Sequence, residues 1–158
     1  MRRKDREVRD IKEICEILDS CRTCHVAMVD GDMPYVVPLS FGYIFTDSGA
    51  LELYFHSAAE GRKIDILRRN NRVCFEISSE GEALKSETPC DAGYYFSSVI
   101  GFGEVLFIED VVNKCEALSI MFKQQTGRDV VFDEGQATSV CVFKIVSADY
   151  AGKRKLKK

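Results

Sequence analysis

Six stretches of the sequence have the composition and alternation of β-strands, and most of them are joined by turn residues rather than by helices. They cover residues 25–29, 34–45, 51–56, 73–77, 94–108 and 140–146. Asp30-Gly31-Asp32 suits a tight hairpin, and Thr46-Asp47-Ser48-Gly49 marks the next turn. A doubly wound parallel sheet would need a helix between every pair of strands. The pattern therefore predicts a mainly β fold, a six-stranded antiparallel barrel with peripheral helices.

Three further stretches have the apolar spacing of α-helices. They cover residues 10–20, 61–69 and 110–125. Asp10 and Asp110 are favourable N-caps, and Gly127 is a stop signal after the third helix. On that helix the spacing predicts an inward face made of Val112, Cys115, Leu118 and Phe122. We expect one domain over residues 1–150, followed by a basic, disordered tail at residues 151–158.

Composition and charge narrow the compartment and the partners. No run approaches the roughly 18 apolar residues that a membrane-spanning helix needs, and the first ten residues are charged where a signal peptide would be apolar. A cytoplasmic protein without membrane contact is expected. Residues 10–152 carry 12 basic and 23 acidic residues, a net charge of −11, so an anionic ligand needs a local basic site. The basic end, residues 153–158, has no interleaved aromatic residue, and no nucleic-acid partner is expected.

Residues 54–65, with the sequence YFHSAAEGRKID, place a strand directly before a helix. The strand ends in the donors His56 and Ser57, and the first helical turn carries Arg62 and Lys63. Free backbone N–H groups, the positive end of the helix dipole and two cations together favour phosphate binding. The two cations also fit an ordinary solvated helix face, and both interpretations stay open on this segment alone.

Cysteine usage raises a second set of hypotheses. The seven cysteines are an odd number, and several lie in apolar periodic segments, so most are expected to be reduced core residues. Cys21-Arg22-Thr23-Cys24-His25 matches the C-x-x-C-H pattern of covalent haem attachment, but such attachment belongs to exported proteins and no export signal is visible. A redox pair or half of a zinc site stays open, although no second close cysteine pair supplies ligands. No metal site is expected.

Four segments of the chain form a recognisable combination. They are Gly31–Phe41 (GDMPYVVPLSF), the His-Ser-x3-Gly-Arg-Lys run at residues 56–63, Asn71–Glu76 (NRVCFE) and Ser97–Glu104 (SSVIGFGE). In order and spacing they resemble the pyridoxamine 5'-phosphate oxidase-like split-barrel flavoproteins, and most of all the nitroimidazole-resistance branch. The resemblance covers roughly residues 1–150. It implies an FMN-binding split β-barrel that works as a homodimer, with the flavin at the dimer interface.

The resemblance also implies where the cofactor lies. The isoalloxazine ring is expected against the strand segment made of Val37, Pro38, Leu39 and Ser40. Because Pro38 has no N–H, this strand must lie at an edge or be open at that point. The phosphate is expected to meet His56, Ser57, Arg62 and Lys63. Ser98, followed by Val99, stands where oxidases of the class place a glutamine beside the ring.

His56 is the candidate catalytic residue. A lone histidine at a strand end is often structural. Its neighbours Ser57, Arg62 and Lys63 favour a role in the site, either as a phosphate donor or as the group nearest to the substrate pocket.

The implied function departs from vitamin B6 oxidation. True pyridoxamine phosphate oxidases carry a C-terminal tryptophan and arginine, whereas this chain has no tryptophan and residues 149–155 offer no matching motif. The resemblance therefore implies an FMN-dependent oxidoreductase that passes electrons from a reduced donor, such as NADH or NADPH, to a small electrophile such as a nitroaromatic. A non-catalytic flavin- or haem-binding carrier or sensor on the same barrel is the alternative.

Overall fold

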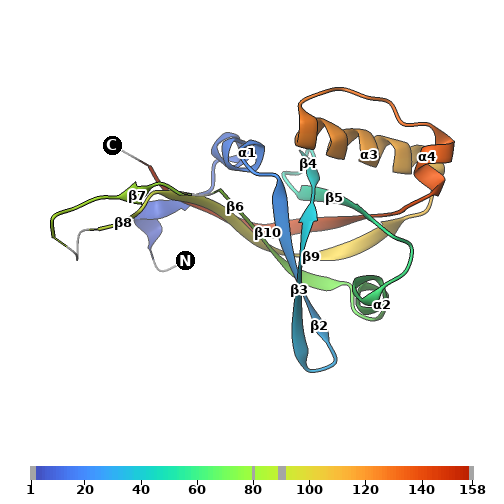
Figure 1. The fold of residues 1–158 in the computed structure, drawn as a ribbon, viewed down its shortest axis with the longest axis horizontal. Helices are drawn as coiled ribbons and strands as arrows, with labels where there is room; N and C mark the ends of the chain where they lie inside the picture. The colour runs from blue at the N-terminus through green and yellow to red at the C-terminus, as the bar shows by residue number, and fades with distance from the viewer. Residues whose placement is uncertain (1–2, 80, 89–91, 157–158) are drawn as a thin grey trace.

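The computed structural model describes residues 3–79, 81–88 and 92–156, and all predicted helices and strand stretches are present in it (Figure 1). The helices are η1 (Lys4–Arg6), α1 (Ile11–Asp19), α2 (Arg62–Arg69), α3 (Val111–Thr126) and α4 (Glu134–Thr138). The strands are β1 (Glu7–Val8), β2 (Thr23–Asp30), β3 (Met33–Ser40), β4 (Gly42–Phe45), β5 (Leu51–Ser57), β6 (Arg72–Ser79), β7 (Ala83–Leu84), β8 (Gly93–Tyr94), β9 (Phe96–Ile108) and β10 (Cys141–Lys155). None of the described helices is long and apolar enough to cross a membrane.

The strands form one large antiparallel sheet and a small separate ribbon. The order in the large sheet is β3-β2-β6-β9-β10-β5-β4, with β1 paired to β10, and the ribbon consists of β7 and β8. The two outer strands of the large sheet, β3 and β4, are consecutive in the chain. The large sheet therefore curls round into a barrel that is split between these two edges (Figure 1). The predicted mainly β, antiparallel class is confirmed. The strand number exceeds six because the predicted stretches at residues 34–45 and 94–108 each divide, the second between β8 and β9, and because β1 and β7 carry no sequence signal.

The stretch that divides is the predicted strand at residues 34–45. The chain turns at Phe41, whose side chain is fully buried, so β3 and β4 lie at opposite edges of the sheet. Gln125 on α3 holds this corner, because its Nε2 donates to the Phe41 carbonyl at 2.8 Å. A Cβ on Gly42 would lie 2.6 Å from the Met121 Cα, so the close approach of α3 requires glycine there. Residues 34–45 are rich in the strand-forming types Val, Ile, Leu, Tyr and Phe on both sides of the corner, which hides the break in the sequence.

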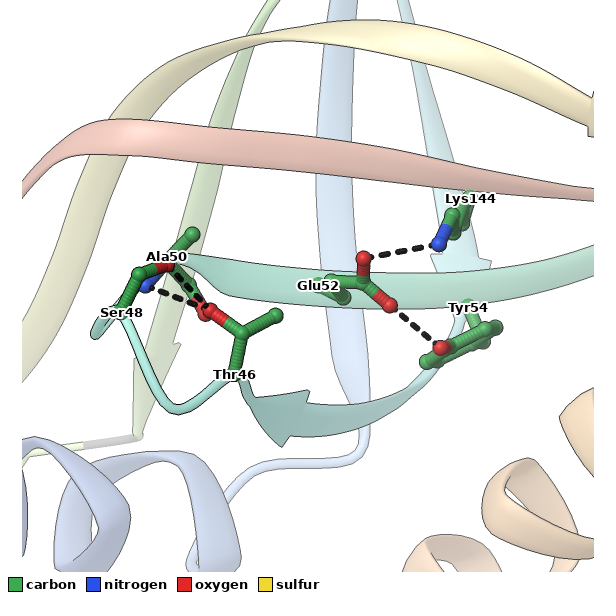
Figure 2. Close-up of polar contacts among 6 residues, drawn as sticks. All are labelled: Thr46, Ser48, Ala50, Glu52, Tyr54 and Lys144. Carbon is green, nitrogen blue, oxygen red and sulfur yellow. Dashed lines mark hydrogen bonds and ion pairs between the residues drawn. The ribbon is translucent and has the colours of Figure 1, made fainter.

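The turn predicted at residues 46–49 is confirmed, and it joins β4 to β5 (Figure 2). Thr46 Oγ1 accepts a hydrogen bond from the Ala50 N–H at 3.1 Å and lies 2.9 Å from Ser48 Oγ. Gly49 adopts a positive φ of 80°, which favours glycine. The side chain of Thr46 therefore replaces part of the backbone pairing that ends at this turn.

The disordered tail predicted from residue 151 is wrong for residues 151–155. β10 continues to Lys155, pairs with β9 as far as Lys155 opposite Phe96, and also pairs with β1, where Glu7 faces Lys153. Arg154 points to the opposite side and forms an ion pair with Glu16 at 3.0 Å. Backbone pairing on both sides orders a segment whose composition alone suggested a solvated tail. Residues 157–158 lie outside the described residues.

The main core fills the barrel, and a second, smaller core lies between the sheet and α3. The barrel core includes the fully buried Phe55, Phe75 and Phe143, with α1 contributing Ile14, Ile17 and Leu18. The smaller core consists of Tyr54, Ala117, Leu118, Met121, Ala137 and Val142. The predicted inward face of α3 is partly wrong, because Val112 is 59% exposed while its neighbour Val111 packs on this core. The close contact at Gly42 fixes a face centred on Ala117 and Met121 instead.

Candidate functional site

An apolar pocket of about 470 Å³ lies between α3, α4 and the ends of β3 and β5. Its lining is Leu118, Met121, Phe122, Phe132, Val140, Ser40, His56, Gln125 and Gln136. The pocket brings together Ser40 and His56, which the sequence assigned to one site although 15 residues separate them. No Asp, Glu, Lys or Arg side chain is among the described lining residues. An apolar pocket with a few neutral polar groups suits a flat, uncharged ring.

The polar groups of this pocket are partly committed to the fold. Gln125 Nε2 donates to the carbonyls of Arg22 and Phe41, so its Oε1 is the atom left for a ligand. Gln136 Oε1 accepts the Asp133 N–H in a capping box, so its Nε2 is left. His56 is exposed on β5, where alternation turns its imidazole away from the barrel interior that Phe55 and Ser57 face. The pocket can thus offer acceptor and donor groups around an apolar floor.

The loop before α2 leaves backbone donors uncovered. Gly61, the N-cap of α2, has φ 134° and makes no side-chain capping bond, so the N–H groups at the first helical positions lack a side-chain partner. A Cβ on Gly61 would meet nothing within 4 Å, so the space in front of the helix is open. Ser57, just before this loop, is 8% exposed, and its Oγ donates to the Ala58 carbonyl at 2.7 Å. The free N–H groups and the open space favour an anion at the start of α2. Ser57 faces the barrel interior and donates its hydroxyl hydrogen to Ala58, so its expected role as a phosphate ligand stays a prediction.

Three cations from two helices, together with the carboxylate of Glu109, lie near enough to Cys141, the first residue of β10, to influence its thiol. Cys141, which pairs with Ser57, has its pKa raised by burial and by Glu109, while Lys114, Arg68 and Lys63 act in the lowering direction. The Arg68 guanidinium lies 5.7 Å from the centre of the Phe107 ring, and Lys114 Nζ donates to the Val140 carbonyl at 3.4 Å. We call Lys63, Arg68 and Lys114 the cation cluster. None of the three forms an ion pair within the described part of the chain.

Sequence reasoning identified Lys63 but missed Arg68 and Lys114. Lys114 lies on α3, 51 residues after Lys63, and joins the cluster because β10 runs back beside β5. For Arg68, the available signal was the pair of adjacent cations at the end of α2, Arg68 and Arg69. Val140 links the cation cluster to the apolar pocket, because its carbonyl accepts a hydrogen bond from Lys114 and the residue also lines the pocket.

Arg62 has different surroundings from Lys63. Its Nε donates to Asp30 Oδ2 at 3.0 Å, and its guanidinium lies 4.6 Å from the centre of the Tyr35 ring. Arg69 bonds the other oxygen of Asp30 at 2.8 Å, so this carboxylate ties the β2–β3 hairpin to α2. A phosphate at Arg62 could use only the Nη atoms. Its expected role as a phosphate ligand stays a prediction.

The prediction that the Pro38 strand lies at an edge is confirmed. β3 ends the sheet order, pairs with β2 alone, and places Pro38 opposite His25. Pro38 and Ser40 are exposed on its outer face, whereas Val37 and Leu39 are half-buried against the barrel core. Backbone groups on the free side of β3 are therefore available to a planar ligand, and the outward side chains form the surface next to it.

Ser98 and Val99 lie far from the other predicted site residues of the same chain. Val99 is fully buried in the barrel core, and Ser98 lies on β9 opposite Lys153. Ser57 is opposite Cys141, 12 residues earlier on β10. At about 3.3 Å per residue, the path along the strand between these points is roughly 40 Å. One chain does not bring Ser98 to the pocket that contains His56.

The C-x-x-C-H motif is divided between two sides of β2. Cys21 and Cys24 are buried in the core, where burial raises the pKa of both thiols. His25 points outward, and its Nδ1 lies 3.1 Å from Glu76 Oε2. Among the described residues no group of three or more His, Cys, Asp or Glu side chains could hold a metal ion. The six described cysteines are free: Cys21 and Cys24 are buried, and Cys15, Cys74, Cys115 and Cys141 are half-buried. Cys90 lies outside the described residues, and the expected reduced state stays a prediction.

Comparison with known proteins decides the family. The family model described as pyridoxamine 5'-phosphate oxidase matches residues 10–154. The chain belongs to this family. It is similar to a solved structure described as a candidate 5-nitroimidazole antibiotic resistance protein from Bacteroides thetaiotaomicron, at 32% identity over 93% of this chain and 85% of that chain, with a TM-score of 0.79.

More distant members and neighbours agree on the fold. A candidate pyridoxamine 5'-phosphate oxidase from Listeria innocua is 26% identical over 88% of this chain and 94% of its own, with a TM-score of 0.55. A flavocytochrome from Azotobacter vinelandii, 20% identical over 99% of this chain and 72% of its own, has a TM-score of 0.80 and shares the fold. None of the curated proteins matches the sequence.

Proposed function

We propose that this chain is an FMN-dependent oxidoreductase that passes electrons from NADH or NADPH to a small electrophile such as a nitroaromatic. One observation carries the proposal: the apolar pocket with His56 and Ser40 adjoins the cation cluster through Val140. FMN has a planar ring at one end and a phosphate at the other, so these two neighbouring environments match its two ends. The similarity to a candidate nitroimidazole-resistance protein supports the choice of acceptor.

The residues present fit FMN. Lys63, Arg68, Lys114 and the uncapped N–H groups of α2 would hold the phosphate, with Arg62 offering its Nη atoms from the side. The free edge of β3, with Pro38 and Ser40 outward, would border the ring. The bound flavin would supply the redox chemistry by taking up two electrons from the donor and releasing them to the acceptor. Solved structures with this fold include a flavocytochrome and a protein described as FAD-binding, which supports a flavin cofactor here.

The side chains that line the pocket would select and position the acceptor. No described lining residue is a carboxylate or a cation, so a neutral, flat acceptor enters without burying an unpaired charge. His56 is the titratable side chain among these lining residues, and we propose that its imidazole delivers a proton to the acceptor. A nitro group that gains two electrons and two protons becomes a nitroso group and releases water, so a proton donor at this place has a defined use.

We propose a homodimer that pairs through the outer face of the sheet. Val36, Ala27, Cys74 and Phe102 lie side by side on four neighbouring strands. The outermost two, Val36 and Phe102, are each 58% exposed. An exposed apolar row of this kind typically marks an interface. A two-fold axis that crosses the strands at this row exchanges the two ends of the sheet. Ser98 of one protomer would then lie at the end where its partner carries α2 and the pocket.

A flavin titration followed by a reduction assay tests this function. Added FMN should lose its fluorescence on binding at micromolar protein, NADPH should bleach the bound yellow chromophore, and a nitroaromatic should restore the colour. Absence of quenching would contradict FMN binding. A bound chromophore that NADH and NADPH do not bleach, and that does not pass electrons to the acceptor after reduction by dithionite, would contradict the oxidoreductase. Such a result would favour the carrier or sensor.

A further inference from the structure

The ends of β9 and β10 bring aromatic and basic side chains together. Lys153 Nζ lies 5.4 Å from the centre of the Phe96 ring, and Lys155 Nζ lies 5.8 Å from the centre of the Tyr95 ring. Tyr94, which precedes them on β8, is 63% exposed. We call Tyr94, Tyr95, Phe96, Lys153 and Lys155 the aromatic-basic strip. Pairing of β9 with β10 builds it from segments that are far apart in the sequence, with Phe96 opposite Lys155, so the sequence of the tail alone does not show it.

The two lysine charges of the strip are available to a ligand. Glu7 is opposite Lys153 on β1 but is bound to Arg9 at 2.6 Å, and Arg154 turns to Glu16 on the other side. No ion pair formed by the described residues uses Lys153 or Lys155. Residues two apart on a strand share a face at about 6–7 Å, so the two ammonium groups can act on one anion. Residues 10–152 carry a net charge of −11, so this positive site is local.

A phosphate ester that also carries a flat ring suits such a strip. Paired ammonium groups bind phosphate oxygens through charge-assisted hydrogen bonds, and an exposed tyrosine ring offers a face on which a purine can stack. A dinucleotide-binding motif with the G-x-G-x-x-G spacing is absent from the sequence, so a nicotinamide donor needs another site. We propose that the aromatic-basic strip binds the adenosine-phosphate end of NADPH.

The location of the strip agrees with this role in the proposed dimer. β7 and β8 lie at one end of the sheet and α2 at the other (Figure 1), and Lys153 is opposite Ser98. The two-fold axis proposed above therefore carries the strip of one protomer to the end of its partner that holds α2 and the pocket. This inference rests on the proposed function, because it assigns the donor of that reaction.

Equilibrium binding of 2′,5′-ADP tests the strip without any turnover. Isothermal titration should show binding to the wild-type protein, weakened roughly tenfold or more in Lys153→Ala/Lys155→Ala, because two charge-assisted contacts are lost. Tyr94→Ala should weaken binding as well and removes no charge. Lys12→Ala/Arg128→Ala removes two exposed charges elsewhere and should bind as the wild type does. Salt should weaken wild-type binding more than that of the strip variant.

Kinetic measurements separate this inference from the proposed function. The strip variant should raise the KM for NADPH about tenfold, while its melting temperature, its FMN affinity and its dithionite-driven reduction of a nitroaromatic stay unchanged. If dithionite supports turnover but the strip variant binds 2′,5′-ADP and NADPH normally, the strip assignment is wrong and the proposed function stands. If a single-stranded oligonucleotide competes for the strip as strongly as 2′,5′-ADP does, the strip is a nucleic-acid site and the inference is wrong.

Discussion

Glu52 forms a partly buried polar unit with Lys144 and Tyr54, and none of the three residues lines the apolar pocket. Its carboxylate accepts hydrogen bonds from Lys144 Nζ at 2.7 Å and Tyr54 Oη at 2.5 Å (Figure 2). Burial on its own would raise the pKa of Glu52, but these two hydrogen bonds outweigh it and hold the pKa below its ordinary value. Burial and the bond to Glu52 raise the pKa of Tyr54. The three residues therefore join β5 to β10 as one polar unit.

Removal of the Glu52 charge should destabilise the fold. Glu52→Gln leaves the Lys144 ammonium, 25% exposed, without its counter-charge, and we expect a loss of about 1–3 kcal/mol in the free energy of unfolding by urea. Glu52→Gln/Lys144→Met should recover most of this loss, because both charges are then gone.

The destabilisation should also depend on pH. A carboxyl whose pKa is lowered by folding adds stability above its unfolded value, and the protein loses this contribution as the pH falls through the folded value. The difference between wild type and Glu52→Gln should thus be constant from pH 6 to 8 and shrink below about pH 4.5. A difference that stays constant down to pH 3 would contradict the ion pair.

At the scale of elements, local signals in the sequence predicted most of the scaffold. The N-caps Asp10 and Asp110, the turn at Thr46 and the edge position of Pro38 follow from backbone chemistry within a few residues. The break at Phe41 escaped prediction because strand-forming residues continue on both sides of it. Arg68 and Lys114 also escaped, because strand pairing of β5 with β10 brings them together. Long-range register, which a single sequence does not encode locally, decided these features.

At the scale of the whole molecule, the described chain contains two separated parts of the expected site. The pocket and the cation cluster lie near the start of β10, whereas Ser98 and the aromatic-basic strip lie near its end. The exposed row on the outer face lies between them, because Phe102 is opposite Asp149 on β10. The proposed two-fold pairing through that row would account for the separation, since each protomer would then supply the part of the site that its partner lacks.

The dimer should depend on this row. Light scattering should give about twice the 17.8 kDa chain mass for the wild type, whereas Phe102→Asp should give a monomer with at least tenfold weaker FMN binding. Val112→Asp is the matched control, because Val112 is 59% exposed on α3 and lies outside the row. A wild-type monomer that keeps bound FMN would rule out the proposed pairing.

Binding of FMN by its phosphate is the central claim, and a paired titration with FMN and riboflavin measures it directly. Riboflavin lacks the phosphate, so Arg62→Ala/Lys63→Ala should leave riboflavin affinity nearly unchanged while it raises the Kd for FMN about tenfold or more, at roughly 1.5–3 kcal/mol per lost charge-assisted contact. Lys63→Ala alone should account for most of the effect, because Arg62 Nε is already bound to Asp30. If the double variant binds FMN as tightly as the wild type does, the phosphate lies elsewhere and the proposed site is wrong.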